Sequence, residues 1–456
     1  MSDSAVVDWS VSSWRSKPAR QLPTYPDPEA LQETLEYLSK MPPLVTSWEI
    51  ENLKTAIAQA AHGERFVLQG GECAESFADC TADVITKRLK ILLQMSLVLT
   101  YGLNTRVVRV GRFAGQYAKP RSSDTETRKG VTLPSYRGDI VNSPEFSEAA
   151  RRPDPQRLVR AYMKSTLTIN LVRALTEGGF ADLRHPEYWD LDFMQHSPLA
   201  DEYHAMVDAI EDSLEFLSAV SGSNLDQLER ASFYTSHEAL HLPYEETHTR
   251  TVPHQPGYYN LGTHFPWIGK RTNHLNGAHI EYMRGIRNPL AVKVGPDMTG
   301  SKLKGLMHTL DPDDEPGRLT LITRFGADAI ADRLPGLIDA VRSTGQTVLW
   351  ICDPMHGNTE KTDNGTKTRR FSNIKSELEQ ALDIHAAEGS RLGGVHFELT
   401  GENVTECIGG ARGLSETDLE RAYKSHVDPR LNYEQALEIA FGIVRKVRSQ
   451  RTRSRH

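Results

Sequence analysis

The chain has 456 residues, 38% of them hydrophobic and 25% charged, a composition typical of a globular protein with a large apolar core. Its formal net charge of −7 offers no basic surface to nucleic acid or an anionic membrane, so we expect neither as a partner. No apolar run approaches the roughly 18 residues of a membrane span, no basic-then-apolar leader opens the chain, and the four cysteines are scattered, so we expect a cytoplasmic protein.

Residues 1–62 are predicted to form an N-terminal extension outside the core. Several prolines punctuate this stretch. Between them, residues 29–40 and residues 47–62 have the amphipathic pattern and the start residues of two helices.

From residue 63 the chain repeats a strand, a polar turn and a helix. Eight short apolar runs are predicted as strands, and each ends in a polar or ionisable residue: 65–69, 105–110, 232–235, 259–263, 289–294, 319–323, 347–352 and 394–399. This pattern predicts a (β/α)8 TIM barrel over residues 63–445. The competing fold, a doubly wound sheet, would carry a glycine-rich phosphate loop after the first strand, and no such motif occurs.

One connection is too long for a single helix. More than 100 residues separate the second and third predicted strands. Residues 157–176 account for the expected barrel helix, and about residues 180–230 are predicted to be extra inserted helices. We expect the extension and this insertion to serve assembly or regulation, and residues 446–456 to form a basic, disordered tail.

A metal site is predicted where strand ends converge. Cys73 and His356 follow two predicted strands, Glu398 lies at the end of another, and Asp428 comes from a later loop. This mixed set of sulfur, nitrogen and oxygen donors suits Mn, Fe, Co or Zn. The alternative is that Cys73 is only a small buried residue.

A group of cations lies at or just beyond the same strand ends. Lys293 stands inside an apolar run, where an unpaired charge is costly. Cations that converge on one barrel mouth call for anions, which points to a phosphorylated small substrate, although each could instead be a solvated surface charge. The group is Arg112, Lys119, Arg121, Arg271, Lys293 and Arg324.

Two further pairs are candidates for the same mouth. His237 and Glu238 could form an acid–base pair, and His264 and Trp267 could wall the pocket. For each, the alternative is a packed residue of the barrel rim.

These motifs resemble the type II 3-deoxy-D-arabino-heptulosonate 7-phosphate (DAHP) synthases over about residues 8–445. The resemblance is carried by Leu68-Gln-Gly-Gly-Glu-Cys-Ala-Glu75, by Cys352-Asp-Pro-Met-His-Gly-Asn-Thr359, and by residues 112–122, 136–139, 236–240, 267–269, 277–279, 292–296, 398–407 and 428–432. It implies a barrel enzyme that condenses phosphoenolpyruvate with erythrose 4-phosphate, the first step of the shikimate pathway.

The resemblance also implies roles for single residues. The metal ligands would be Cys73, His356, Glu398 and Asp428, holding Mn²⁺ or Co²⁺ first, with Zn²⁺, Fe²⁺ or Cd²⁺ as further candidates. The catalytic residues would be Lys293, Arg112 and His356. The substrates would be bound by Arg112, Lys119, Arg121, Ser122, Trp267, Lys270, Arg271, Lys293 and Arg324.

Lys270 is a departure, because the family commonly has Glu at this position. We expect little change if only the backbone of Lys270 takes part in binding.

The long extension and the insertion resemble those of feedback-regulated members. This implies a homo-oligomer, a dimer or a tetramer, that is inhibited by aromatic amino acids, and it makes a chorismate mutase a candidate partner. Two alternatives stay open: an aminoDAHP-type synthase of secondary metabolism, and an inactive regulatory paralogue. The intact ligands and cations argue against the second.

Overall fold

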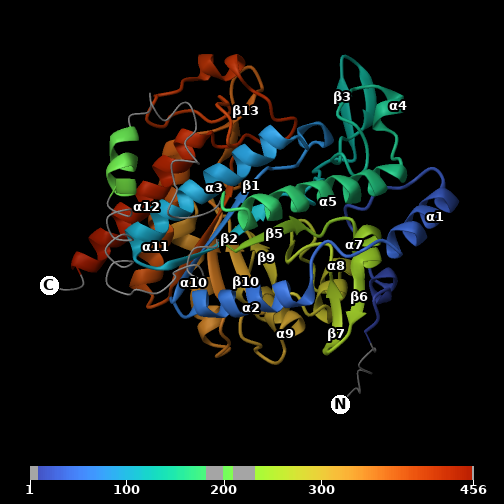
Figure 1. Ribbon diagram of the computed structural model, residues 1–456, viewed down its shortest axis with the longest axis horizontal. Coiled ribbons are helices and arrows are strands. Elements are labelled where there is room, and N and C mark those ends of the chain that lie inside the picture. The colour runs from blue at the N-terminus through green and yellow to red at the C-terminus, as the bar shows by residue number, and fades with distance from the viewer. Residues whose placement is uncertain (1–8, 181–198, 209–231, 454–456) are drawn as a thin grey trace.

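The computed structural model describes residues 9–180, 199–208 and 232–453. Within them, eight parallel strands close into a barrel in the order β1-β14-β11-β10-β9-β8-β5-β2 (Figure 1). Their bounds are β1 Arg65–Gly71, β2 Arg106–Arg112, β5 Phe233–Glu238, β8 Phe265–Ile268, β9 Leu290–Val294, β10 Leu319–Thr323, β11 Leu349–Cys352 and β14 Leu392–Glu398. The predicted (β/α)8 TIM barrel is confirmed.

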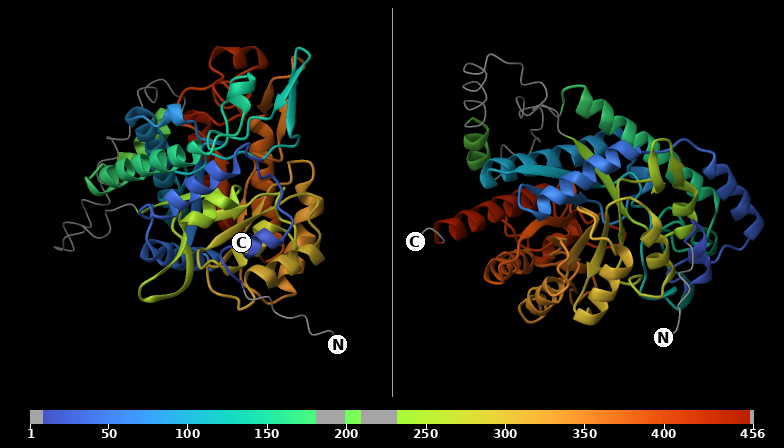
Figure 2. Two further views of the ribbon diagram at one scale, coloured as in Figure 1. Left: turned by 90° about the vertical axis from the view of Figure 1, so that its right-hand side faces the viewer. Right: turned by 90° about the horizontal axis from the view of Figure 1, so that it is seen from below.

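Helices surround the strands, and three hairpins project from them. The helices are α1 Pro28–Ser39, α2 Ser47–Ala61, α3 Ala82–Leu103, α4 Glu148–Arg151, α5 Gln156–Glu177, α7 Leu242–His248, α8 Ala278–Gly285, α9 Gly300–Leu310, α10 Ile330–Arg342, α11 Phe371–Ala387 and α12 Tyr433–Arg453. The hairpins pair β3 Thr125–Arg128 with β4 Val131–Pro134, β6 Thr249–Val252 with β7 Gln255–Asn260, and β12 Thr359–Lys361 with β13 Lys367–Arg369. Figures 1 and 2 show α1 and α12 at opposite ends of the molecule.

The strands are buried on both faces, as parallel strands covered by helices must be. Every residue of β9 and β10 is buried. Val67, Phe265 and Ile351 belong to one apolar cluster in the interior of the barrel. The buried polar side chains of Gln69, Lys293 and His396 lie near the carboxyl ends of their strands, where the barrel opens.

The fourth barrel strand lies later than predicted. Residues 259–263 do not form it, because Tyr259 and Asn260 end β7 and pair antiparallel with β6. The barrel strand is β8, whose Trp267 pairs with Ala291 of β9. Pro266 inside β8 hides this strand from a pattern search, since proline argues against a central strand.

The extension is only partly outside the core, which corrects the prediction for residues 47–61. Helix α2 begins with a capping box formed by Thr46 and Glu49. Its Leu53, Ile57 and Ala60 are fully buried in the same cluster as the interior strand residues, so α2 closes the amino-terminal end of the barrel (Figure 1).

The predicted tail is also partly wrong. Helix α12 runs to Arg453, and its end is held to the end of α3 by two hydrogen bonds. Arg448 Nε donates to Gly102 O at 3.0 Å, and Arg451 Nη1 donates to Leu103 O at 2.9 Å. Residues 454–456 lie outside the described residues. Most of the insertion predicted at 180–230 also lies outside them, apart from a helical stretch at 200–208. No helix in the described ranges is long and apolar enough to cross a membrane.

Candidate active site

Three of the four predicted metal ligands meet at the carboxyl end of the barrel. Gly71, the last residue of β1, pairs with Glu398 of β14, and Cys73 follows two residues later. Asp428 reaches the same point from the loop before α12. The ligand atoms of Cys73, Glu398 and Asp428 lie within 4.8 Å of one another, and Cys73 and Glu398 are fully buried.

His356, the fourth predicted ligand, joins this group through Glu398. Its Nε2 lies 2.9 Å from Glu398 Oε1, and its Nδ1 lies 2.7 Å from Asp353 Oδ2. A carboxylate on one ring nitrogen fixes the orientation of a histidine and leaves the other nitrogen to a ligand. Asp353 therefore orients His356 so that Nε2 faces Glu398, one of the other three donors.

The donor set already accommodates positive charge. Lys119 Nζ lies 2.8 Å from Cys73 Sγ and also contacts Asp428, while Arg369 Nη2 lies 2.7 Å from Glu398 Oε2. Burial would raise the pKa of Glu398, but His356 and Arg369 hold it well below its ordinary value. The residues thus fit a bound cation with sulfur, nitrogen and oxygen ligands.

The Cys73 thiol must lose its proton before it can bind a metal ion. Burial, followed by the charge of Glu398, raises the pKa of Cys73 above its ordinary range. A divalent ion would displace the thiol proton, because a coordinating thiol is deprotonated by the metal.

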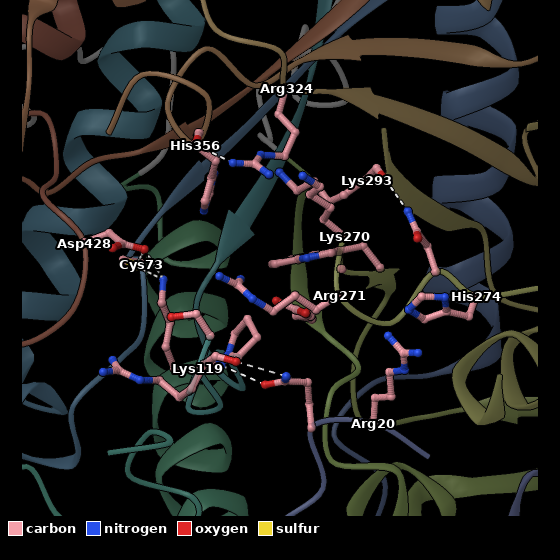
Figure 3. Close-up of a pocket in the computed structure, with 18 of the residues that line it drawn as sticks. Arg20, Cys73, Lys119, Lys270, Arg271, His274, Lys293, Arg324, His356 and Asp428 are labelled. Carbon is pink, nitrogen blue, oxygen red and sulfur yellow. Dashed lines mark hydrogen bonds and ion pairs between the residues drawn. The ribbon is translucent and has the colours of Figure 1, made fainter. Parts of the chain in front are cut away.

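A cavity of about 610 Å³ opens beside these donors (Figure 3). Cys73, His356 and Asp428 line it, as do all nine residues predicted to bind substrate: Arg112, Lys119, Arg121, Ser122, Trp267, Lys270, Arg271, Lys293 and Arg324. The three residues predicted to be catalytic, Lys293, Arg112 and His356, therefore share one cavity. The predicted site residues thus lie together around one cavity, and the role of each residue stays a prediction.

The cavity is strongly cationic. Among the described residues that line it, nine are lysine or arginine and three, Glu238, Asp297 and Asp428, are carboxylates. Lys293 is buried and its Nζ contacts Asp353. Burial nevertheless lowers the pKa of Lys293 to about 8. Such a site favours ligands that carry several negative charges.

Arg112 is held by a buried polar chain that the sequence pattern did not reveal. Its guanidinium contacts His396 Nε2, and His396 Nδ1 lies 2.7 Å from Gln69 Oε1. Gln69 Nε2 in turn donates to Ser236 Oγ at 3.0 Å. The Trp267 ring lies beneath the guanidinium, 5.2 Å from Arg112 Cζ. Only burial distinguishes Gln69 and His396 from other strand residues, and burial is not visible in the sequence.

The predicted acid–base pair is divided. His237 Nε2 bonds to Glu245 Oε1 at 2.8 Å and not to Glu238. Glu238 lines the cavity, its Oε1 has no hydrogen-bond partner in the described part of the chain, and burial raises its pKa. His264 does not wall the cavity as predicted, because its ring contacts Thr235 instead.

Several cavity residues were not predicted. Arg20 and Gln21 come from the N-terminal extension, and nothing in their local pattern connects them to residues about 100 positions away. The others are Gln116, Pro120, Gly269, Asn273, His274, Asp297 and Lys302. The side chain of Lys270 lines the cavity, and its Nζ lies 3.1 Å from Asp297 Oδ1. The lysine at this position, where the family commonly has Glu, therefore places its positive charge next to a carboxylate.

Comparison with known proteins gives a consistent result. The family described as the Class-II DAHP synthetase family matches residues 9–444. A phospho-2-dehydro-3-deoxyheptonate aldolase of Neurospora crassa is 48% identical over 459 residues, covering 97% of this chain and 95% of the relative. One of Streptomyces coelicolor is 48% identical over 439 residues, covering 96% and 97%.

A solved structure of a phospho-2-dehydro-3-deoxyheptonate aldolase from Francisella tularensis is a more distant match. It covers 92% of this chain and 96% of its own, with 13% identity and a TM-score of 0.48. This likeness is too weak to add to the strand order described above.

Proposed function

This chain belongs to the class-II DAHP synthetase family, and we propose that it condenses phosphoenolpyruvate with erythrose 4-phosphate to give DAHP and phosphate. The observation that carries the proposal is the placement of four metal-type donors at the edge of one cavity lined by nine cations among the described residues. Both substrates are small anions, and such a cavity can neutralise both at once.

The phosphoenolpyruvate would lie against Arg112, Lys293, Arg271 and Arg324. All four line the cavity. Within the described residues, neither Arg271 nor Arg324 forms an ion pair with a carboxylate. Arg324 Nη2 contacts the carbonyl oxygen of His356, which keeps this cation beside the metal donors. Holding two substrates in one orientation converts a two-body encounter into an effectively unimolecular step.

The aldose phosphate would lie against the loop 119–122. Arg121 and Ser122 line the cavity on the side of this loop, and Lys119 lies between it and the metal donors. Cys73, His356, Glu398 and Asp428 would hold a divalent ion, Mn²⁺ or Co²⁺. When bound, this ion would act as a Lewis acid on the aldehyde carbonyl.

The bond changes then follow from the substrates. Carbon 3 of phosphoenolpyruvate forms a bond to the aldehyde carbon, and the carbonyl π electrons pass to the aldehyde oxygen, which takes up a proton and becomes a hydroxyl group. Water adds at carbon 2 and loses a proton, and the carbon–oxygen bond to phosphate then breaks, which releases phosphate and leaves a ketone at carbon 2. Glu238 is suited to take the proton of that water, because burial raises its pKa and its Oε1 has no partner among the described residues.

Product analysis tests this proposal. Phosphoenolpyruvate labelled with ¹⁸O at its bridging oxygen should release that label in phosphate, and only when erythrose 4-phosphate is present. Label retained in the seven-carbon product would contradict carbon–oxygen cleavage. Turnover of the imino analogue of the aldose in preference to erythrose 4-phosphate would favour the aminoDAHP alternative.

We also propose a cytoplasmic homo-oligomer that assembles through the extension. Tyr37 of α1, Trp48 of α2, and Met163 and Leu167 of α5 are large apolar residues exposed by 46%, 65%, 50% and 57%. Such exposure on neighbouring helices is typical of protein interfaces, and α1 packs against α5. All four cysteines lie in the described residues and none forms a disulfide, which suits a reducing compartment.

Sedimentation of Trp48→Glu beside the unaltered chain tests the assembly. A shift to a smaller species is expected, and an unchanged species would contradict it. Titration of Trp, Phe and Tyr, alone and combined, into the activity assay tests the expected inhibition.

A further inference from the structure

The first part of the N-terminal extension is bound along the barrel, close to the cavity. Hydrogen bonds hold it on both sides of Arg20 and Gln21. They are Trp9 Nε1 to Glu281 O at 2.9 Å, Trp14 Nε1 to Glu246 Oε2 at 2.9 Å, Ala278 N to Pro18 O at 3.1 Å, and Tyr25 Oη with His241 Nε2 at 2.9 Å. Trp14 and Tyr25 are themselves buried. Arg20 and Gln21 are therefore held at a defined position on the cavity wall.

Gln21 forms a two-sided bond with the backbone of Arg121. The Arg121 N–H donates to Gln21 Oε1 at 2.7 Å, and Gln21 Nε2 donates to Arg121 O at 3.0 Å. Arg137 Nη1 donates to Gln21 O at 3.3 Å, so Gln21 is fixed in turn. Its φ of 67° is in the left-handed region, which a residue other than glycine adopts only where its surroundings hold it.

Arg20 presents a charge to the same cavity, on the side away from the metal donors. Figure 3 shows its guanidinium beside His274, away from Cys73 and Asp428. Within the described residues Arg20 has no carboxylate partner, whereas Arg15 of the same segment pairs with Glu246 at 2.9 Å. The Arg20 charge is thus available to an anion in the cavity.

We propose that the N-terminal extension completes the substrate pocket: Gln21 is a positioning residue that holds the loop 119–122, and Arg20 contacts an anionic group of the phosphorylated aldose. This inference rests on the proposed function for the identity of the ligand, but not for the bond between Gln21 and Arg121. It adds a role in substrate binding to a segment expected to serve only assembly or regulation.

Amide hydrogen exchange tests the positioning role without any substrate. In the full-length Gln21→Ala variant, the peptide that contains Arg121 should exchange at least about tenfold faster, because its N–H loses its acceptor. In Gln21→Glu the carboxylate still accepts this bond, so exchange should stay within about twofold of the unaltered chain. Equal exchange in all three proteins, measured with the thermal midpoint of each, would overturn the positioning role.

Steady-state kinetics test what the pocket gains. Gln21→Ala and Arg20→Ala should each raise KM for erythrose 4-phosphate about tenfold, equal to about 1.4 kcal/mol, with kcat and KM for phosphoenolpyruvate within about twofold. Arg15→Ala is the matched control, since Arg15 belongs to the same segment but does not line the cavity. An unchanged KM in Arg20→Ala would overturn the contact with substrate.

The two arms separate this inference from the proposed function. If the unaltered chain does not turn over the two substrates, the proposed function fails, and the exchange result still decides whether Gln21 holds the loop. If turnover is normal and both the exchange rates and KM are unchanged in the variants, the inference fails alone.

Discussion

Replacing Arg430 by glutamine should weaken metal binding, although Arg430 is not a predicted ligand. Arg430 lies two residues after Asp428, and Glu72 lies directly before Cys73. Arg430 Nη1 bonds to Glu72 Oε2 at 2.6 Å, and both side chains are buried. This pair ties together the two loops that carry the sulfur donor and one oxygen donor.

The expected size of the effect follows from burial. Arg430 also donates to Glu406, from Nη2 at 2.7 Å and from Nε at 3.0 Å, so the substitution removes an arginine partner from two buried carboxylates, of which Glu72 keeps its pair with Arg88 at 2.9 Å. Removing one member of a buried ion pair costs about 3–5 kcal/mol of folding free energy. Loss of support behind metal ligands typically lowers metal affinity about 10- to 100-fold.

Competition against a chromophoric chelator would give the dissociation constant for Mn²⁺, and urea unfolding of the metal-free proteins would give stability. Arg318→Gln is the matched control. Arg318 is equally buried, but it donates to backbone carbonyls such as Met283 O at 2.9 Å, away from the metal donors. The control should lose stability and keep its Mn²⁺ affinity. The reasoning is refuted if Arg430→Gln binds Mn²⁺ within about twofold of the unaltered chain.

Three further predictions address the metal and the titrating groups. Cys73→Ser should remove the thiolate-to-metal absorption of the Co²⁺ form; a band that persists would mean that Cys73 is not a ligand. The free energy of unfolding should fall as pH drops from about 6.5 toward 4. Four histidines are buried in the folded chain, where burial lowers their pKa to about 4, whereas in the unfolded chain they take up protons at the ordinary pKa; these are His241, His248, His279 and His385. Urea midpoints at pH 7, 6 and 5 measure this, and equal midpoints would contradict it. KM for phosphoenolpyruvate should rise above about pH 8 as Lys293, whose pKa burial lowers to about 8, loses its charge; a KM that stays constant to about pH 9.5 would speak against Lys293 as a binding cation.

The sequence could predict the part of the site that depends on strand ends. Cys73, His356 and Glu398 end or follow strands that read clearly as apolar runs, and parallel strands bring their carboxyl ends to one mouth. Lys293 could be singled out because a cation inside an apolar run needs a partner, which the structure provides in Asp353.

The rest depends on contacts between distant residues. Pro266 masked the fourth strand, and the apolar face of α2 gave no sign that it would close the barrel rather than lie outside it. Gln21 meets Arg121 across 100 positions, and Arg430 meets Glu72 across 358. Contacts of this kind depend on how the whole chain folds, and the local pattern of apolar and polar residues does not predict them.

The most direct test of the proposed function is phosphate release from phosphoenolpyruvate and erythrose 4-phosphate, with and without prior chelation. We expect release only when both substrates are present, loss of release after thorough chelation, and recovery on adding Mn²⁺ or Co²⁺. Release that survives chelation would contradict the metal role of Cys73, His356, Glu398 and Asp428. No release from the metal-loaded protein under any condition would contradict the proposed reaction itself.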